Sequence, residues 1–293
     1  MNPAFLDKSA RRPFAEALVA VQRIHPLVDC ITNIVTVNDV ANGLLAIDAR
    51  PVMASAPEEI EYIVAGADAM LCNLGATAGD QREAMLKGSA HAHHLGKPVV
   101  IDPVGIGASP LRHHQINALL QTAPVAAIRG NISEIKALAG LSTDAGGVDA
   151  SSADLEDPRG FEAATKLAQS LAKHHHTIIA ISGPRDIVSD GTRTFIVNGG
   201  NEMMTRVTGS GCTLTGLVAA FVAAYPQDTL VATTAAIALM CMAGDRALAQ
   251  TGSHATASFR VAMFDALSAI TPTDCIDGFR IQQLSEEDTL THD

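Results

Sequence analysis

The sequence contains no tryptophan and is poor in other aromatic residues and in charge. Of its 293 residues, 3% are aromatic and 17% are charged, whereas 47% are hydrophobic. This apolar content excludes a largely disordered chain, and the core has to be built from aliphatic side chains and methionine. Basic residues are a minority, with 20 Lys and Arg against 31 Asp and Glu and a net charge of −11. Because a basic surface and stacking rings are both scarce, we expect no nucleic-acid partner.

The cysteines form no metal-binding or redox motif. They number five, never occur as CxxC, and stand at Cys30, Cys72, Cys212, Cys241 and Cys275. An odd, scattered set is typical of a protein from the reducing cytoplasm and excludes a disulfide scaffold. The first 13 residues lack the apolar segment of a signal peptide. We therefore predict a cytoplasmic location.

Charge is missing altogether between Arg206 and Asp228, and again between Asp228 and Asp245. Two uncharged runs of this length raise the alternative of a membrane hairpin. However, the first run includes several glycines and Pro226, and neither run adjoins the basic short loop that sets membrane orientation. We favour two helices buried inside the protein and expect no membrane contact.

Short apolar runs alternate with helix-like segments over most of the chain. The predicted strands are Leu27–Ile31, Pro51–Ala54, Ala69–Cys72, Pro98–Ile101, Val125–Ile128 and Thr177–Ile181. The predicted helices are 9–24, 38–48, 57–65, 79–95, 110–122 and 132–139. Strands that are apolar on both faces and alternate with helices predict a parallel sheet covered by helices on both sides.

The pattern changes near residue 182. Residues 187–197 predict two strands around an Asp-Gly turn, which would add antiparallel strands to one edge of the sheet. Three apolar helices follow, at about 211–225, 229–249 and 254–270. The fold class is therefore α/β, a three-layer arrangement around a mostly parallel sheet, which we expect to be one domain over residues 1–293.

Two segments fit this alternation poorly. The Gly-, Asp- and Ser-rich stretch 142–158 predicts a loop. The last 23 residues, 271–293, hold six acidic residues and one basic residue and so contribute −5 of the net charge. We interpret residues 271–293 as an acidic C-terminal tail, whose last stretch is solvated and a candidate for disorder.

The most informative motif is Thr208-Gly209-Ser210-Gly211-Cys212-Thr213, directly before a long apolar helix. Glycines allow a ligand close to the backbone, and free N–H groups at a helix start favour an anion. We predict an anion hole from Gly209, Ser210, Gly211 and Cys212 that suits a transferring phosphoryl group. The segment matches neither the Walker P-loop nor the dinucleotide fingerprint. An ordinary glycine-rich helix start is the alternative.

Cys212 lies in the first turn of that predicted helix. A thiol at a helix N-terminus is expected to have a lowered pKa, which makes Cys212 a candidate general base or nucleophile. The alternative is a small buried apolar side chain.

Further candidates follow from the rule that open α/β sheets bind ligands at the carboxyl ends of their strands. Asp102 suits a magnesium-linked or phosphate-facing role, or it caps a turn. Asn131 and Glu134 resemble the capping box of a helix. Arg129 is a natural phosphate partner, and the Ser182 hydroxyl is either a ligand contact or part of a turn.

Asn33 and Asn38 follow the first strand, and Met53 lies in the second. Two amides and a methionine suit a small, neutral, partly apolar substrate, although Met53 could equally pack in the core. The histidine runs predict solvated helix faces and no metal site, because adjacent residues on a helix point apart. Together, the candidates favour magnesium-dependent phosphoryl transfer from a nucleotide to a small alcohol.

The chain resembles the hydroxyethylthiazole kinase family, whose fold is ribokinase-like. The resemblance rests on several short segments in combination: 30–33, 37–38, 41–46, 51–54, 101–105, 128–131, 147–150 and 208–212. Cys212 is the best discriminator, because the related sugar, pyridoxal and hydroxymethylpyrimidine kinases place an aspartate base there.

The resemblance implies transfer of the γ-phosphate of ATP to the hydroxyl of 4-methyl-5-(2-hydroxyethyl)thiazole in thiamine salvage. It implies Mg²⁺, with Asp102 and Glu134 on the metal and phosphate side. It also implies a homotrimer with active sites at the subunit interfaces.

By the same resemblance, Met53 and Gly209 contact the thiazole, while Arg129 and Ser182 contact ATP. The family usually has threonine at position 182. Asp39 and Val40 also depart from the family, which commonly has Phe-Thr there. The alternatives are a related kinase for pyridoxal or hydroxymethylpyrimidine, and a non-catalytic binder of a nucleotide or a thiazole.

Overall fold

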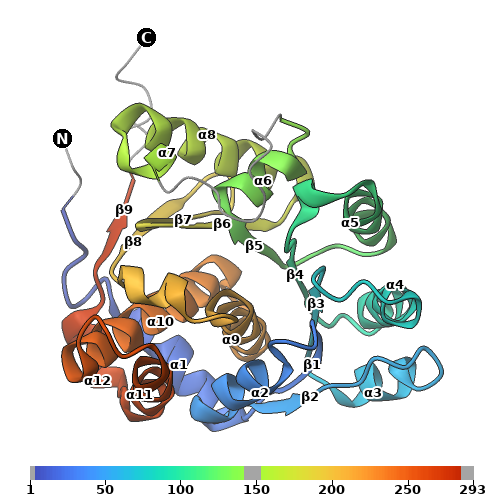
Figure 1. Ribbon diagram of the computed structural model, residues 1–293, viewed down its shortest axis with the longest axis horizontal. Coiled ribbons are helices and arrows are strands. Elements are labelled where there is room, and N and C mark those ends of the chain that lie inside the picture. The colour runs from blue at the N-terminus through green and yellow to red at the C-terminus, as the bar shows by residue number, and fades with distance from the viewer. Residues whose placement is uncertain (1–3, 142–152, 285–293) are drawn as a thin grey trace.

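The computed structural model describes residues 4–141 and 153–284. A nine-stranded sheet runs through this part of the chain in the order β2-β1-β3-β4-β5-β6-β7-β8-β9 (Figure 1). The strands are β1 (Leu27–Ile31), β2 (Arg50–Val52), β3 (Ala69–Asn73), β4 (Val99–Asp102), β5 (Ala127–Asn131), β6 (Ile178–Ser182), β7 (Arg185–Ser189), β8 (Thr194–Asn198) and β9 (Ile281–Gln283). Strands β1 to β6 pair in parallel, and β6 to β9 pair antiparallel. The predicted mixed sheet is confirmed.

Helices cover both faces of the sheet (Figure 1). One layer comprises α1 (Arg12–Ile24), α2 (Val37–Ala46), α9 (Ser210–Ala224), α10 (Thr229–Thr251), α11 (Thr256–Ala269) and α12 (Pro272–Gly278). The other comprises α3 (Ile60–Gly66), α4 (Gly79–His94), α5 (Pro110–Thr122), α6 (Ile132–Leu138), α7 (Ala153–Glu156) and α8 (Pro158–His175). Two short 3-10 helices, η1 (Ile106–Ala108) and η2 (Glu202–Arg206), lie in loops.

The two core clusters follow from the alternation of side chains along the strands. In β1, Cys30 packs into the α9 and α10 layer and Ile31 into the opposite layer; in β3, Leu71 and Cys72 divide in the same way. A strand that is covered on both faces has to be apolar throughout, which explains the continuous apolar runs in the sequence.

The uncharged runs form helices inside the protein. Among the described residues, one helix, α10, is long and apolar enough to cross a membrane, and 83% of its most apolar 18-residue window is buried. Helix α9 is shorter and almost entirely buried beside it. The prediction of two buried helices is confirmed.

Four of the α-helices and strands were not predicted: α7, α8, α12 and β9. The prediction of a loop over 142–158 is wrong for its end, where α7 and the start of α8 lie. Helix α8 buries mostly alanine, which gives little apolar contrast in the sequence. The acidic segment begins with α12, where Thr271 and Asp274 form a capping box, and continues into β9, which pairs with β8. The expectation of a tail is therefore wrong for residues 272–283. The structure does not describe residues 285–293 at the end of the acidic segment. It also does not describe residues 142–152 of the predicted loop, which include the family segment 147–150.

Candidate active site

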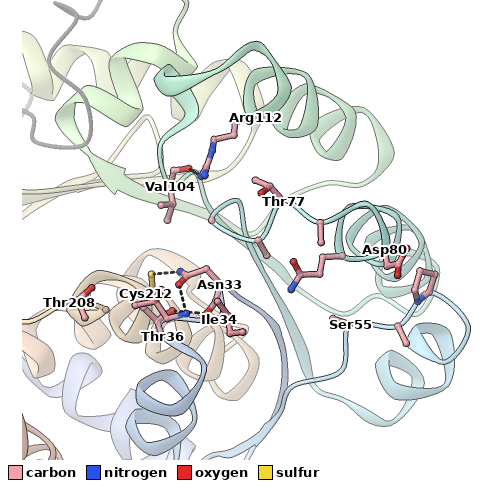
Figure 2. A pocket seen from close by; sticks show the side chains of 18 of the residues that line it. Asn33, Ile34, Thr36, Ser55, Thr77, Asp80, Val104, Arg112, Thr208 and Cys212 are labelled. Atoms are coloured by element: carbon pink, nitrogen blue, oxygen red, sulfur yellow. Dashed lines mark hydrogen bonds between the residues drawn. The ribbon is translucent and has the colours of Figure 1, made fainter.

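A cavity of about 980 Å³ opens at the carboxyl ends of the first four strands (Figure 2). Residues 33–36 follow β1, residues 55–58 follow β2, residues 75–78 follow β3, and Val104 follows β4. The start of α9 closes one side with Thr208, Gly209 and Cys212. The cavity lies where an open parallel sheet is expected to bind its ligand.

The glycines of the 209–212 loop are required by close contacts on both sides. Gly209 has φ +84°, and a Cβ there would lie 2.8 Å from Cγ2 of Thr36. A Cβ at Gly211 would lie 2.7 Å from Nη1 of Arg129. Since no side chain caps the N-terminus of α9, the first N–H groups of the helix are available to an anion. The loop therefore has the geometry of the predicted anion hole, with the Ser210 hydroxyl donating to Met204 O.

Cys212 is half-buried and accepts a hydrogen bond from Nδ2 of Asn33 at 3.6 Å (Figure 2). Burial and the neighbouring charge of Asp102 raise the pKa of the Cys212 thiol to about 11. The expectation of a lowered pKa is wrong, because loss of solvent outweighs the favourable dipole of α9. At neutral pH, Sγ keeps its proton.

Asp102 lies at the end of β4 and is fully buried. Its Oδ2 accepts hydrogen bonds from Asn73 Nδ2 at 3.0 Å and from Thr215 Oγ1 at 2.9 Å. Burial raises the pKa of Asp102 to about 7, and the positive charge of Arg129 opposes this rise. The sequence argument missed both partners. Asn73 is a polar residue one position beyond the predicted strand, and Thr215 lies one helical turn after Gly211.

Arg129 and Ser182 meet across neighbouring parallel strands. Arg129 lies in β5 and donates through Nε to Ser182 Oγ, at the end of β6, over 2.8 Å. Because the guanidinium also packs against Gly211, the two predicted nucleotide contacts lie beside the predicted anion hole.

Glu134 accepts hydrogen bonds from backbone N–H groups through both of its carboxylate oxygens. Oε2 accepts from Asn131 N at 2.9 Å, which completes the capping box of α6, and Oε1 accepts from Gly105 N at 3.0 Å. Through its bond to Gly105 N, Glu134 lies beside the turn that follows Asp102, and its charge raises the pKa of Asp102. A cation bound by both carboxylates would offset this repulsion.

No group of three or more potential metal-ligating side chains was found within residues 4–141 and 153–284. A divalent cation at Asp102 and Glu134 would therefore complete its shell with phosphate oxygens and water, which is the usual habit of Mg²⁺.

Two predicted substrate contacts lie away from the cavity. Met53 packs against the core on the α9 side, and Asn38 is exposed on α2, where it bonds Asn42. Of the residues that depart from the family, Asp39 forms an ion pair with Arg260 of α11, and Val40 is buried against Gly216.

Comparison with known proteins gives consistent matches over nearly the whole chain. A family model described as "Hydroxyethylthiazole kinase family" matches residues 18–273. A hydroxyethylthiazole kinase from Methanoculleus marisnigri is 40% identical over 92% of this chain and 93% of its own length. One from Thermoanaerobacter pseudethanolicus is also 40% identical, over 88% of this chain and 94% of its own.

Solved structures agree with these matches. The structure of a hydroxyethylthiazole kinase from Pyrococcus horikoshii has a TM-score of 0.82 at 37% identity and covers 93% of this chain and 99% of its own. A ribokinase-like superfamily protein from Enterococcus faecalis has a TM-score of 0.59 at 15% identity, over 92% of this chain and 96% of its own, which concerns the fold alone. The predicted ribokinase-like fold is confirmed.

Proposed function

Because the chain belongs to the hydroxyethylthiazole kinase family, we propose that it transfers the γ-phosphate of ATP to the hydroxyl of 4-methyl-5-(2-hydroxyethyl)thiazole in thiamine salvage. One observation carries the proposal. The 209–212 loop faces the cavity through Gly209 and Cys212 and packs through Gly211 against Arg129. The loop thus separates an acceptor cavity from the Arg129–Ser182 pair, as phosphoryl transfer between two bound substrates requires.

The residues of this chain act chiefly by position and charge. The N–H groups at the start of α9 hold the transferring phosphoryl, and Arg129 balances its negative charge. Cys212 stands beside the acceptor hydroxyl with its proton on Sγ, so its role is contact and orientation more than proton removal. A loose transition state leaves little negative charge on the attacking oxygen and needs little help from a base.

Mg²⁺ is proposed as the cofactor, with Asp102 and Glu134 as the residues that would hold it. When bound, the ion supplies charge neutralisation to the phosphates and fixes their orientation. Thr215 and Asn73 aim the Asp102 carboxyl through their hydrogen bonds to Oδ2. The pairing of Asp102 with ATP-bound metal would favour its ionised form over the neutral form that burial promotes.

We also propose that the working protein is a cytoplasmic homotrimer whose subunits share each acceptor site. Ile34 and Val35 line the cavity, yet their side chains are 90% and 68% exposed. Two exposed aliphatic residues at the rim of a polar cavity suit burial against another subunit. In this assembly we propose that Met53 and Asn38 contact a thiazole bound at the subunit interface. The mass of the assembly in solution tests the trimer.

The deciding experiment is a coupled ADP-release assay with ATP and Mg²⁺ over a panel of vitamin precursors. The proposal expects turnover with the thiazole alcohol well above that with pyridoxal or hydroxymethylpyrimidine. A higher rate with either competitor would assign the chain to that substrate. Tight binding of the thiazole without ADP release would make the protein a binder instead of an enzyme.

A further inference from the structure

Arg112, in the first turn of α5, is the only cationic residue among the described residues that line the cavity. Its side chain is half-buried. Nη1 donates to Val104 O at 2.6 Å (Figure 2). The same atom donates to Leu74 O at 2.8 Å. No carboxylate of the described residues pairs with this guanidinium within 4.0 Å. The guanidinium therefore makes its hydrogen bonds to backbone carbonyls at the wall of the cavity and not to an acid.

The two carbonyls belong to the two loops that form one wall of the cavity. Leu74 opens the loop after β3, which continues into residues 75–78, and Val104 lies in the turn after β4. The backbone ladder between β3 and β4 ends at the hydrogen bond from Leu74 N to Asp102 O, so the loops beyond this bond depend on side chains for their relative position. Arg112 supplies one such side-chain contact through a single nitrogen atom.

The same loops carry the Asn73–Asp102 pair of the candidate active site. Leu74 N donates to the backbone oxygen of Asp102 at 2.9 Å, while Leu74 O receives Arg112. On the far side of the turn after β4, Gly105 has φ +64° and donates its N–H to Glu134. The turn is therefore held from two directions, by Glu134 at Gly105 and by Arg112 at Val104.

We propose that Arg112 is a positioning residue for the acceptor, which joins the loops after β3 and β4 and thereby sets the wall of the acceptor cavity. This inference rests on the proposed function for the identity of the acceptor. Arg112 lies on the acceptor side of the 209–212 loop, whereas Arg129 and Ser182 lie on the nucleotide side. Loss of Arg112 should therefore act on the acceptor much more than on ATP.

The test compares Arg112→Lys and Arg112→Met with the parent and with Arg11→Met. Arg11 is a matched control, because its Nη1 also bridges two backbone oxygens, those of Asp277 and Phe279, and lies outside the cavity. For Arg112→Met we expect the KM for the thiazole alcohol to rise at least about tenfold and the KM for ATP to change less than about twofold. A lysine, which has no planar fork, should restore only part of the loss. Arg11→Met should leave both KM values unchanged.

Equal changes in both KM values, or no change in either, would overturn the inference while leaving the proposed function intact. If the parent itself fails to phosphorylate the thiazole, the proposed function fails, and the inference is then decided by amide hydrogen exchange. In that measurement, Arg112→Lys should speed exchange in residues 74–78 and 104–106 and not in α9. Unchanged exchange in both loops would refute the positioning role without any reference to turnover.

Discussion

Asp29 is a buried acid that should make this protein less stable as the pH rises. It lies in β1 with no exposed surface. Oδ1 accepts from Ala54 N at 3.3 Å, and Oδ2 has no hydrogen-bond partner. Burial raises the pKa of Asp29 from 3.8 to about 7, and the charge of Glu59 adds to the rise. The folded protein therefore keeps a proton that the unfolded chain releases.

The sign follows from proton linkage. Between pH 3.8 and about 7 the folded state binds more protons than the unfolded state at this site, so raising the pH favours unfolding. The stabilisation is complete below the unfolded pKa and is lost once the pH passes the folded one. The rise in the pKa of Asp29 from 3.8 to about 7 corresponds to about 4 kcal/mol in total. About 3 kcal/mol of this should be lost between about pH 5 and pH 8.

The perturbation is Asp29→Asn, which keeps an oxygen for Ala54 N–H and removes the titration. The amide places an unsatisfied N–H₂ near the position of Oδ2, which costs about 1–3 kcal/mol at every pH. Urea unfolding at one protein concentration, from about pH 5 to pH 8, gives the free energy of unfolding for parent and variant. The variant should lose about 3 kcal/mol less than the parent across this range.

Two other buried acids do not affect the difference in pH dependence between the parent and Asp29→Asn. The pKa of Asp102 is raised to about 7 and that of Asp186 to about 6, mainly by burial, and both remain in the variant. Asp265→Asn, at an exposed position of α11, is the matched control and should follow the parent. If Asp29→Asn and the parent lose stability in parallel with pH, the carboxyl is ionised in the folded protein and the reasoning about burial is wrong.

Three further substitutions test the proposed site. Arg129→Ala should raise the KM for ATP at least about tenfold through loss of a charged phosphate contact, and an unchanged KM would remove Arg129 from the nucleotide site. Cys212→Ser should lower kcat less than about tenfold, since Sγ holds its proton and the reaction needs little base; a loss of several orders of magnitude would restore Cys212 as the base. Gly209→Ala should cost about 1–2 kcal/mol in thermal unfolding, because φ is +84° and Thr36 blocks the Cβ, and full stability would show that the loop relaxes.

The resemblance to the hydroxyethylthiazole kinase family, drawn from short segments, is confirmed by the family model and by relatives at 40% identity. Each of those segments is short and contiguous in the sequence. Their functional residues stand at the ends of strands and at the start of one helix, where the residue type indicates the chemistry. Arg129, Ser182 and Asp102 could be chosen for this reason, because polar residues leaving apolar strands stand out in the sequence. The assignment of the chain to a single domain stays a prediction.

The sequence alone determined the α/β class, the alternation of parallel strands with helices, and the glycine-rich loop. Each of these depends on local periodicity or on backbone freedom. Contacts between distant segments required the tertiary structure. The Asn73–Asp102–Thr215 hydrogen bonds join β3, β4 and α9, and Arg112 joins two loops. The high pKa of Cys212 also depends on contacts between distant segments. Its position in the helix predicts a lower value, but burial next to Asp102 depends on how the whole chain packs, and in this protein burial has the larger effect.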